Sequence, residues 1–257
     1  MSSKTNVGRN VPMRRFPEFR GASEWRENTL KDVANFIKNK MPLSELTLET
    51  YVSTENLLAE YCGFSIASKL PQLGAVTRFK QQDILISNIR PYLKKIWLAS
   101  FDGGASNDVV VIRTKDNASS EFLALLLMNE EFISYVMKGA KGVKMPRGDI
   151  SLMRKYPLSV PSQEEQQKIV ACLSSIDDLI AAETQKLDAL RTHKKWLMQQ
   201  LFLAEGETVP KLRFPEFRNA PAWQVKKSSS LFINRVEEGD AGLPIYSVTM
   251  NDGMIRR

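Results

Sequence analysis

The chain has 257 residues, 43% of them hydrophobic and 25% charged, a balance typical of folded globular proteins and unlike that of disordered chains. Its formal net charge of +7 favours a polyanionic partner, while no apolar run reaches the roughly 18 residues that a membrane span needs. The first ten residues lack the apolar core of a signal peptide, and Cys62 and Cys172 stand far apart without zinc-ribbon spacing. We therefore expect a cytoplasmic protein with no membrane partner.

One short segment occurs twice in the chain. Residues 11–25 read VPMRRFPEFRGASEW and residues 209–223 read VPKLRFPEFRNAPAW, so ten of the fifteen positions are identical at an offset of 198 residues. An offset of this size corresponds to a whole domain, since the units of solenoid repeats are much shorter, at about 20 to 50 residues. We therefore expect one complete module followed by the opening of a second.

Residues 1–25 are predicted to be a polar, loose tail followed by an extended connector. Pro12 and Pro17 exclude a regular helix and a central strand there. Aromatic side chains are expected to attach the connector to a neighbouring surface: Phe16, Phe19 and Trp25.

Residues 26–160 are predicted to form one mixed α/β domain of the α+β class. A short amphipathic helix is expected where apolar residues recur at helical spacing: Leu30, Val33, Ala34 and Ile37. Strands are expected in three β-branched or aromatic runs that Pro91 and Gly103-Gly104 separate: residues 83–89, 94–100 and 108–113. A helix is then expected over residues 121–138, with Gly139 as its C-terminal cap.

Residues 161–205 are predicted to form one long helix that begins with Ser162 as N-cap and Glu165 at the capping-box position. It would run for about 41 residues, or roughly 60 Å at 1.5 Å per residue. Ten residues follow each other at strict 4-3 spacing and define the seam: Ile169, Leu173, Ile176, Ile180, Glu183, Leu187, Leu190, Lys194, Leu197 and Leu201. Because eight of them are apolar, the helix is expected to pair with another helix in a coiled coil. The alternative is a long helix packed on its own domain.

Residues 206–257 are predicted to be a second connector and the truncated start of a second domain. A strand is expected over residues 244–250, with a turn at residues 251–253 and another strand from Met254. Residues 224–257 are expected to be poorly ordered or only locally structured, because they cannot bury enough apolar surface by themselves.

No catalytic or metal-binding arrangement is evident in the sequence. The single histidine, His193, falls among charged residues of the long helix, where a solvated position is the simplest interpretation. The sequence contains no GxxxxGK[ST] phosphate loop, no GxGxxG and no His/Cys cluster. We therefore predict that the chain has no catalytic residues and no metal site.

Basic residues gather in two segments outside the long helix. Residues 161–205 have a net charge of −2, which leaves +9 on the remainder of the chain. Basic side chains in or beside loops that contain Pro or Gly suit phosphate contacts, and we predict such contacts from two groups of residues: Arg78, Lys80, Arg90, Lys94 and Lys95, and Lys138, Lys141, Lys144 and Arg147. The alternative interpretation is an ordinary basic surface.

Several segments together resemble one family, the DNA-specificity subunits of type I restriction–modification enzymes. They are the repeated RFPEFR…W, the stretch YPLSVPSQEEQQKIVACLSSIDDLI at residues 156–180, the helix end KKWLMQQLF, and DILISNIRPYLKKI at residues 83–96. The resemblance implies two target-recognition domains, each followed by a long helix, that read the two halves of a bipartite site in double-stranded DNA. It also implies that the paired helices bind methyltransferase (modification) subunits, which ATP-driven restriction subunits join.

The same resemblance places S-adenosylmethionine, ATP and Mg²⁺ on those partner subunits and no cofactor on this chain. The sequence departs from the family pattern, since it has one recognition domain, one long helix and only the opening of a second domain. A half-length specificity subunit that works as a homodimer, or beside another partial specificity chain, is therefore expected. A coiled-coil adaptor that binds only proteins and a nuclease with an unrecognised site are the alternatives.

The polar seam positions predict the direction of helix pairing. A parallel, in-register homodimer would oppose Glu183 to Glu183 and Lys194 to Lys194. An antiparallel pair that crosses between Leu187 and Leu190 opposes Glu183 to Lys194 twice and matches apolar residues elsewhere. An antiparallel homodimer is therefore expected, with two identical recognition domains at its ends.

Overall fold

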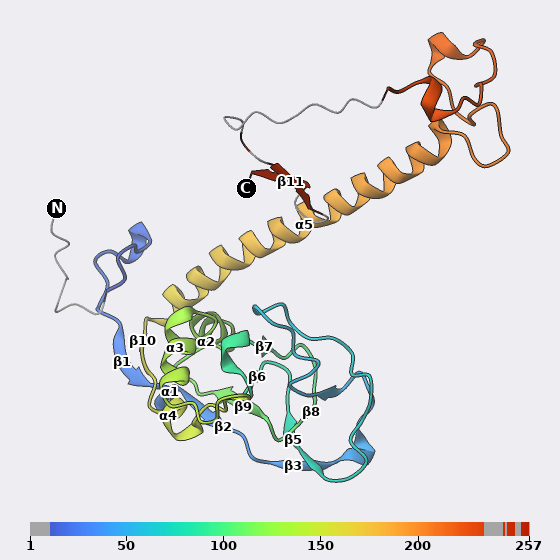
Figure 1. Cartoon of the computed structure of the whole chain (residues 1–257). Coiled ribbons are helices and arrows are strands. Elements are labelled where there is room, and N and C mark those ends of the chain that lie inside the picture. Colours follow the sequence, from blue (N-terminus) through green and yellow to red (C-terminus); the bar gives the residue numbers. More distant parts are fainter. Residues whose placement is uncertain (1–10, 234–243, 245, 250–252, 257) are drawn as a thin grey trace. The chain divides into compact units, whose positions relative to one another are not determined.

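The computed structural model of the chain describes residues 11–233, 244, 246–249 and 253–256 (Figure 1). Contacts divide the chain into two compact units, Met1–Ala181 and Ala182–Arg257, and helix α5 (Gln163–Leu201) runs through the boundary. The predicted tail at residues 1–10 and the turn residues 251–252 lie outside the described residues.

A four-stranded antiparallel sheet forms the centre of the first unit, with the strand order β2-β9-β6-β7. Its strands are β2 (Ala34–Phe36), β6 (Ile84–Ser87), β7 (Ile96–Leu98) and β9 (Val109–Thr114). The three predicted strands are thus confirmed as β6, β7 and β9. Every residue of β6 is buried, because both faces of this sheet are covered.

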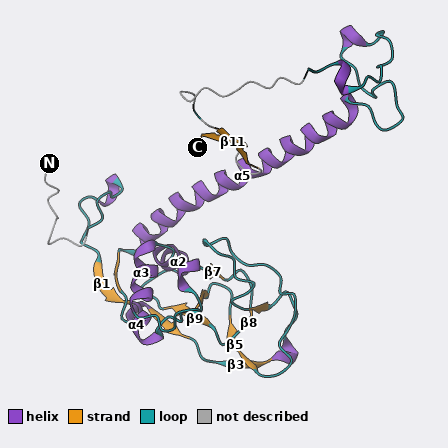
Figure 2. Cartoon of the chain, in the orientation of Figure 1, coloured by secondary structure: helices purple, strands orange, loops and turns teal. Residues whose placement is uncertain are grey.

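Helices cover one face of the central sheet and a second sheet covers the other (Figure 2). The helices are α1 (Leu30–Val33), α2 (Ser120–Leu127), α3 (Glu130–Lys138) and α4 (Ile150–Arg154). The second sheet has the order β3-β5-β8-β4, from β3 (Lys40–Pro42), β5 (Ala75–Phe79), β8 (Gly103–Ala105) and β4 (Tyr51–Val52). Side chains of β6 alternate between the layers, with Ile84 and Ile86 in the helix-side core and Leu85 in the other. This mixed architecture confirms the predicted α+β class.

A two-stranded antiparallel ribbon joins the beginning and the end of the first unit. Strand β1 (Arg26–Thr29) pairs with β10 (Pro157–Val160), with Arg26 opposite Val160. Since α5 begins three residues after β10, this ribbon brings residues just before β1 close to the start of the long helix.

Two expectations about local structure are wrong. The helix predicted from Leu30 to Ile37 is only the four-residue α1, because the next residues extend as β2 and pair with β9. The helix predicted over residues 121–138 is two helices, since the Asn129 side chain accepts a hydrogen bond from Phe132 N and caps α3 anew. Gly139 does occupy the C-cap position of α3.

The Gly103-Gly104 pair, expected only to separate two strands, forms the strand β8 itself. A Cβ at Gly103 would lie 2.2 Å from the backbone oxygen of Thr50 and 2.7 Å from the Phe79 ring. Only glycine therefore allows β8 to approach β4 and β5 this closely.

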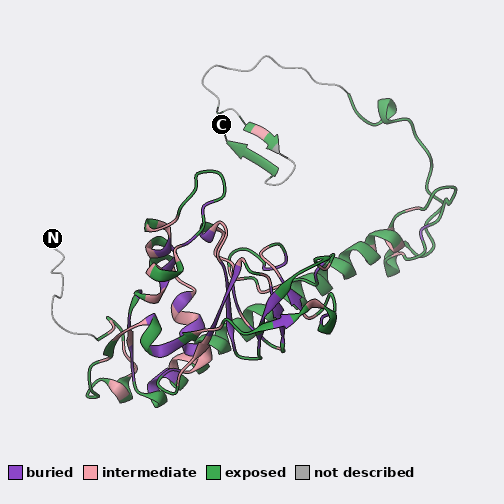
Figure 3. Cartoon of the chain, turned by 90° about the horizontal axis from the view of Figure 1, so that it is seen from below, coloured by how far each residue is buried: buried purple, intermediate pink, exposed green. Residues whose placement is uncertain are grey.

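The long helix is confirmed, and its 39 residues come close to the predicted length. Ser162 Oγ accepts a hydrogen bond from Glu165 N at 3.3 Å, as an N-cap does. Most of the apolar seam is exposed, from 40% at Leu173 to 58% at Ile180 in the first unit and 56% at Leu190 in the second (Figure 3). Ile169 at one end packs against the helix-side core and Leu201 at the other lies beside the second repeat, but the described residues leave the middle of the seam exposed.

The second unit contains the repeated segment and a hairpin. Strands β11 (Tyr246–Thr249) and β12 (Gly253–Arg256) pair antiparallel, which confirms the two strands predicted there. The described residues also include five 3₁₀ turns: η1 (Pro17–Phe19), η2 (Leu43–Glu45), η3 (Pro91–Leu93), η4 (Pro215–Phe217) and η5 (Ser228–Ser230).

Candidate nucleic-acid interface and helix junction

The two basic segments predicted from the sequence lie side by side in the first unit. A loop over residues 141–147 is closed by two hydrogen bonds of 2.9 Å, from Lys141 N to Arg147 O and from Arg147 N to Lys141 O. Arg90 N donates to Pro146 O at 2.8 Å, which joins this loop to the segment between β6 and η3. Basic residues that are some fifty positions apart in the sequence therefore share one surface.

The contact between these loops depends on special backbone positions. Gly148 donates its N–H to Asn88 O at 3.1 Å, and a Cβ at Gly148 would lie 2.9 Å from Asn88 Oδ1. Arg90 and Lys94 adopt left-handed conformations with φ of 50° and 55°, and they bracket η3. Such conformations in residues other than glycine gather at functional sites.

Two polar atoms at this contact are buried and have no hydrogen-bond partner among the described residues. They are Asn88 Oδ1 and Arg90 Nε. A buried polar atom without a partner is costly, and an ordered water or a ligand can complete its hydrogen bonds. The contact between the two basic segments thus leaves two buried polar atoms without a hydrogen bond in the described part of the chain.

Acidic side chains already neutralise some of the predicted cations. Lys94 Nζ lies 2.6 Å from Glu130 Oε1 and 3.0 Å from Glu60 Oε2, and these hydrogen bonds raise the pKa of Lys94. Arg147 Nη1 lies 3.0 Å from Asp108 Oδ1. These two cations therefore have less charge to offer to a phosphate.

Lys95 differs from its neighbour Lys94. Its Nζ donates to Thr54 O at 2.7 Å. Partial burial lowers the pKa of Lys95, and the nearby Arg90 charge lowers it further. Lys95 thus stands beside the same surface but is held by the backbone of another loop.

Other predicted cations are exposed. The side chains of Lys138, Lys141 and Lys144 are exposed and form no ion pair within the described part of the chain. Val143 is fully exposed and Met145 is half exposed between them, so the loop presents apolar side chains together with positive charge.

Arg78 and Lys80 are not brought to this loop. They lie on and directly after β5 of the second sheet, and Arg78 Nη2 is 2.7 Å from Glu45 Oε2. Arg78 and Lys80 are thus separated from Arg90, Lys95, Lys141, Lys144 and Arg147, which lie around one loop contact, with Lys94 and Lys138 beside them.

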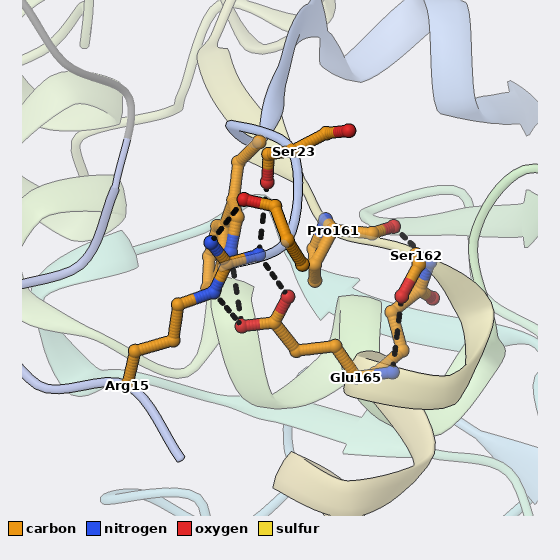
Figure 4. A network of polar contacts seen from close by, with 8 residues as sticks. Arg15, Ser23, Pro161, Ser162 and Glu165 are labelled. Atoms are coloured by element: carbon orange, nitrogen blue, oxygen red, sulfur yellow. Dashed lines mark hydrogen bonds and ion pairs between the residues drawn. The ribbon is translucent and has the colours of Figure 1, made fainter. Parts of the chain in front are cut away.

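The sequence interpretation missed a junction that fixes the start of the long helix (Figure 4). Arg15 donates from Nε to Glu165 Oε1 at 2.8 Å and from Nη2 to Glu165 Oε2 at 2.7 Å. Trp25 Nε1 donates to the same Oε1 at 3.3 Å, and the carboxylate is almost completely buried. The hydrogen bond with Glu165 raises the pKa of Arg15.

This junction corrects the role predicted for Glu165. The carboxylate does not return to the helix N-cap but binds Arg15, so only the Ser162 half of the capping box forms. Gln166, fully buried, adds a second attachment, since its Oε1 accepts from Ser119 N at 2.8 Å and its Nε2 donates to Pro161 O at 3.1 Å. The first turn of α5 is therefore held firmly on the first unit.

A signal for the junction was present in the repeat. Arg15 recurs as Arg213 and Trp25 as Trp223. The sequence predicted an attachment for the ring of Trp25, but it assigned no role to the charge of Arg15. A polar residue that survives in both copies indicates a bonding role rather than a solvated surface.

The described residues contain no group of three or more His, Cys, Asp or Glu side chains arranged to hold a metal ion. A search of the same residues finds no helix that is both long and apolar enough to cross a membrane.

Comparison with known proteins identifies the family. Residues 22–192 match the model of the type I restriction modification DNA specificity domain, which covers the whole α+β layer structure and most of α5. The chain therefore belongs to this family of DNA specificity domains.

Two relatives are specificity subunits of type I restriction enzymes. The chain is 26% identical over 190 residues to the type I restriction enzyme HindI specificity subunit of Haemophilus influenzae, covering 70% of this chain and 41% of that protein. It is also 26% identical over 181 residues to the MjaVIII specificity subunit of Methanocaldococcus jannaschii, covering 70% and 42%. The chain thus matches less than half of the length of these relatives.

Solved structures share the fold. The HsdS subunit from Thermoanaerobacter tengcongensis superposes with a TM-score of 0.51 at 22% identity, over 75% of this chain and 54% of that one. The type I S subunit from M. genitalium superposes with a TM-score of 0.51 at 16% identity, over 76% and 48%.

Proposed function

We propose that the first unit reads one half of a DNA target site and that the chain is a non-catalytic, half-length specificity subunit. The observation that carries this proposal is the loop contact that unites Arg90, Lys141 and Lys144 on one surface of a specificity-domain fold. Phosphate contacts from such loops position a protein on DNA, and they leave the bases to neighbouring side chains. The buried, unpartnered Asn88 Oδ1 and Arg90 Nε fit a surface that is completed by its ligand.

Partners follow from the same proposal. The relatives are specificity subunits of type I restriction enzymes, which supports a complex with methyltransferase (modification) and restriction subunits. S-adenosylmethionine, ATP and Mg²⁺ would then act in those subunits. The chain would recognise the DNA target site, and the partner subunits would catalyse the reactions.

Duplex binding tests this function against a coiled-coil adaptor that binds only proteins. The purified chain should bind duplex DNA with an affinity that falls steeply with salt, because phosphate contacts release counterions. Binding that is absent at low salt, or insensitive to salt, contradicts the proposal. Cleavage or methyl transfer by the chain alone would favour an enzyme instead.

We also propose that α5 pairs antiparallel with α5 of a second molecule. Its support is the exposed apolar seam, together with Glu183 and Lys194 as the polar seam positions. Glu183 Oε2 lies 3.4 Å from Lys186 Nζ in a pair that is more than half exposed, so it is available to a stronger partner. Another partial specificity chain could replace the second molecule.

Charge exchange tests the register. Sedimentation should show a dimer at tens of micromolar, and Glu183→Lys should weaken it because two like-charged layers appear. Adding Lys194→Glu should restore it. Lys195→Glu, which reverses a charge one residue outside the seam, serves as the matched control and should have little effect. A strict monomer contradicts self-pairing, and a double variant that is not restored contradicts the register.

A further inference from the structure

The two repeats adopt the same local structure in their separate units. Pro17–Phe19 and Pro215–Phe217 both form 3₁₀ turns. Arg15 donates to Ala22 O at 3.1 Å and to Ser23 O at 2.9 Å. Arg213 donates in the same way to Ala220 O and to Pro221 O, the latter at 2.9 Å. In each repeat the arginine side chain thus bonds to backbone oxygens seven and eight residues later, and the two guanidinium groups have equivalent positions within their repeats.

The repeats differ in what lies opposite the remaining guanidinium face. In the first repeat, Nε of Arg15 donates to Glu165. In the second repeat, Nε of Arg213 is buried and has no hydrogen-bond partner among the described residues. The second repeat is thus the arginine half of the same junction without its carboxylate.

The second repeat instead holds the end of α5. Leu212 N donates to Gln200 O at 2.9 Å, and the Phe202 and Trp223 rings pack edge to face with their centroids 6.4 Å apart. An apolar groove runs along this contact and is lined by Leu201, Phe202, Pro210, Leu212, Phe214 and Trp223. The first repeat therefore binds the start of a long helix, and the second binds the end of one.

The start of α5 is complementary to such a segment in charge as well as in shape. Besides the Arg15–Glu165 pair, Lys168 Nζ lies 3.2 Å from Glu18 Oε1 and 5.8 Å from the centre of the Phe16 ring. The second repeat carries the matching residues, because Phe214, Glu216 and Arg213 stand at the same spacing. An Arg–Glu and a Glu–Lys pair can therefore form on it as on the first repeat.

We propose that residues 209–223 form a docking site for the start of α5 of a second molecule, with Arg213 bound to Glu165 of the partner subunit. This inference rests on the antiparallel pairing proposed above. The register that opposes Glu183 to Lys194 also opposes Leu201 to Ile176. The partner's Glu165 then lies 11 residues, or roughly 16 Å at 1.5 Å per residue, beyond the end of this helix, where this chain continues into the second repeat. Arg213 then competes with the partner's Arg15 for one carboxylate, and dimerisation is coupled to release of the partner's first repeat.

Hydrogen exchange, measured by mass spectrometry on the full chain across a dilution series, tests this site. At concentrations where exchange slows in residues 173–198 of the helix, exchange in residues 209–223 should slow about tenfold, as expected for one buried charge-assisted pair. Arg213→Ala should remove the protection of residues 209–223 and leave that of the helix. Arg218→Ala, which removes an exposed charge from the same repeat, is the matched control and should behave as the parent chain does.

A second variant separates docking from local folding, because Arg213→Ala also removes the bonds to Ala220 and Pro221. Arg15→Ala removes the competitor for Glu165 and leaves the second repeat intact, so it should increase the protection of residues 209–223. If the helix is protected and residues 209–223 are not, the docking site is wrong and the pairing stands. If neither is protected, the pairing fails and the docking site with it. Protection that is independent of concentration places the partner within the same chain and also overturns the proposal.

Discussion

Lys144 provides the sharpest test of the basic loop. Its side chain is exposed at the tip of the loop and has no ion pair within the described residues. Lys94, by contrast, is held by Glu60 and Glu130 at 3.0 and 2.6 Å. The two lysines belong to the same predicted set, and the structure makes opposite predictions for them.

The size of the effect follows from counterion release. Each phosphate contact contributes about 0.9 to the slope of the logarithm of affinity against the logarithm of salt concentration. Lys144→Ala should therefore reduce the slope by about 0.9. When the salt concentration rises from about 50 to 200 mM, the variant should then lose roughly 3.5-fold less affinity than the parent chain does. Lys94→Ala should change the slope much less, because its two carboxylates already neutralise that charge.

Fluorescence anisotropy with a labelled duplex of arbitrary sequence and one that contains the target site would measure both slopes. Because phosphate contacts carry no sequence information, Lys144→Ala should weaken both duplexes alike. A loss confined to the target duplex would make Lys144 a base-reading residue. Equal slopes for Lys144→Ala and the parent chain, with a reduced slope for Lys94→Ala, would refute the reasoning from ion pairs.

Two further predictions concern stability. Gly148→Ala should lower the free energy of unfolding by about 1 to 3 kcal/mol through overpacking, since its Cβ would lie 2.6 Å from Met153 Cε. Gly21→Ala, where nothing lies within 4 Å, should be nearly neutral in the same thermal melts, and equal effects would contradict the packing account. The pKa of Asp32 is lowered in the folded chain, mainly by the side-chain hydrogen bond from Thr29. Ionised Asp32 therefore stabilises the fold at pH values above the unfolded pKa of 3.8, and this stabilisation is lost as the pH falls through the lower pKa of the folded chain. Asp32→Asn should therefore flatten the dependence of the melting temperature on pH in the acid range, and an unchanged pH profile would count against the role of this pair.

Local patterns in the sequence were sufficient for several elements. The runs that became β6, β7 and β9 are apolar at successive positions, and the long helix is marked by a proline start, an N-cap serine and an uninterrupted 4-3 spacing. These signals are local because a strand buried on both faces and a heptad seam each repeat their chemistry along one segment. The repeat of residues 11–25 was also visible without any structure.

Tertiary contacts decided the rest. The spacing from Leu30 to Ile37 is that of a helix, but pairing with β9 extends the chain after Val33, because a sheet edge offers hydrogen bonds that a short helix cannot match. Gly103 and Gly104 indicate only a break between strands, but in the fold they form β8, because the neighbouring segments lie too close for any side chain.

The site depended on the same kind of long-range contact. The sequence alone determined that two basic segments and one heptad helix exist, since charge and periodicity are properties of single segments. Only the fold joined Arg90 to the loop of residues 141–147, and only the fold turned Glu165 from its own helix to Arg15, which is 150 residues away. The physical reason is that a buried carboxylate takes the partner that neutralises it, and the β1–β10 ribbon decides which partner comes within reach.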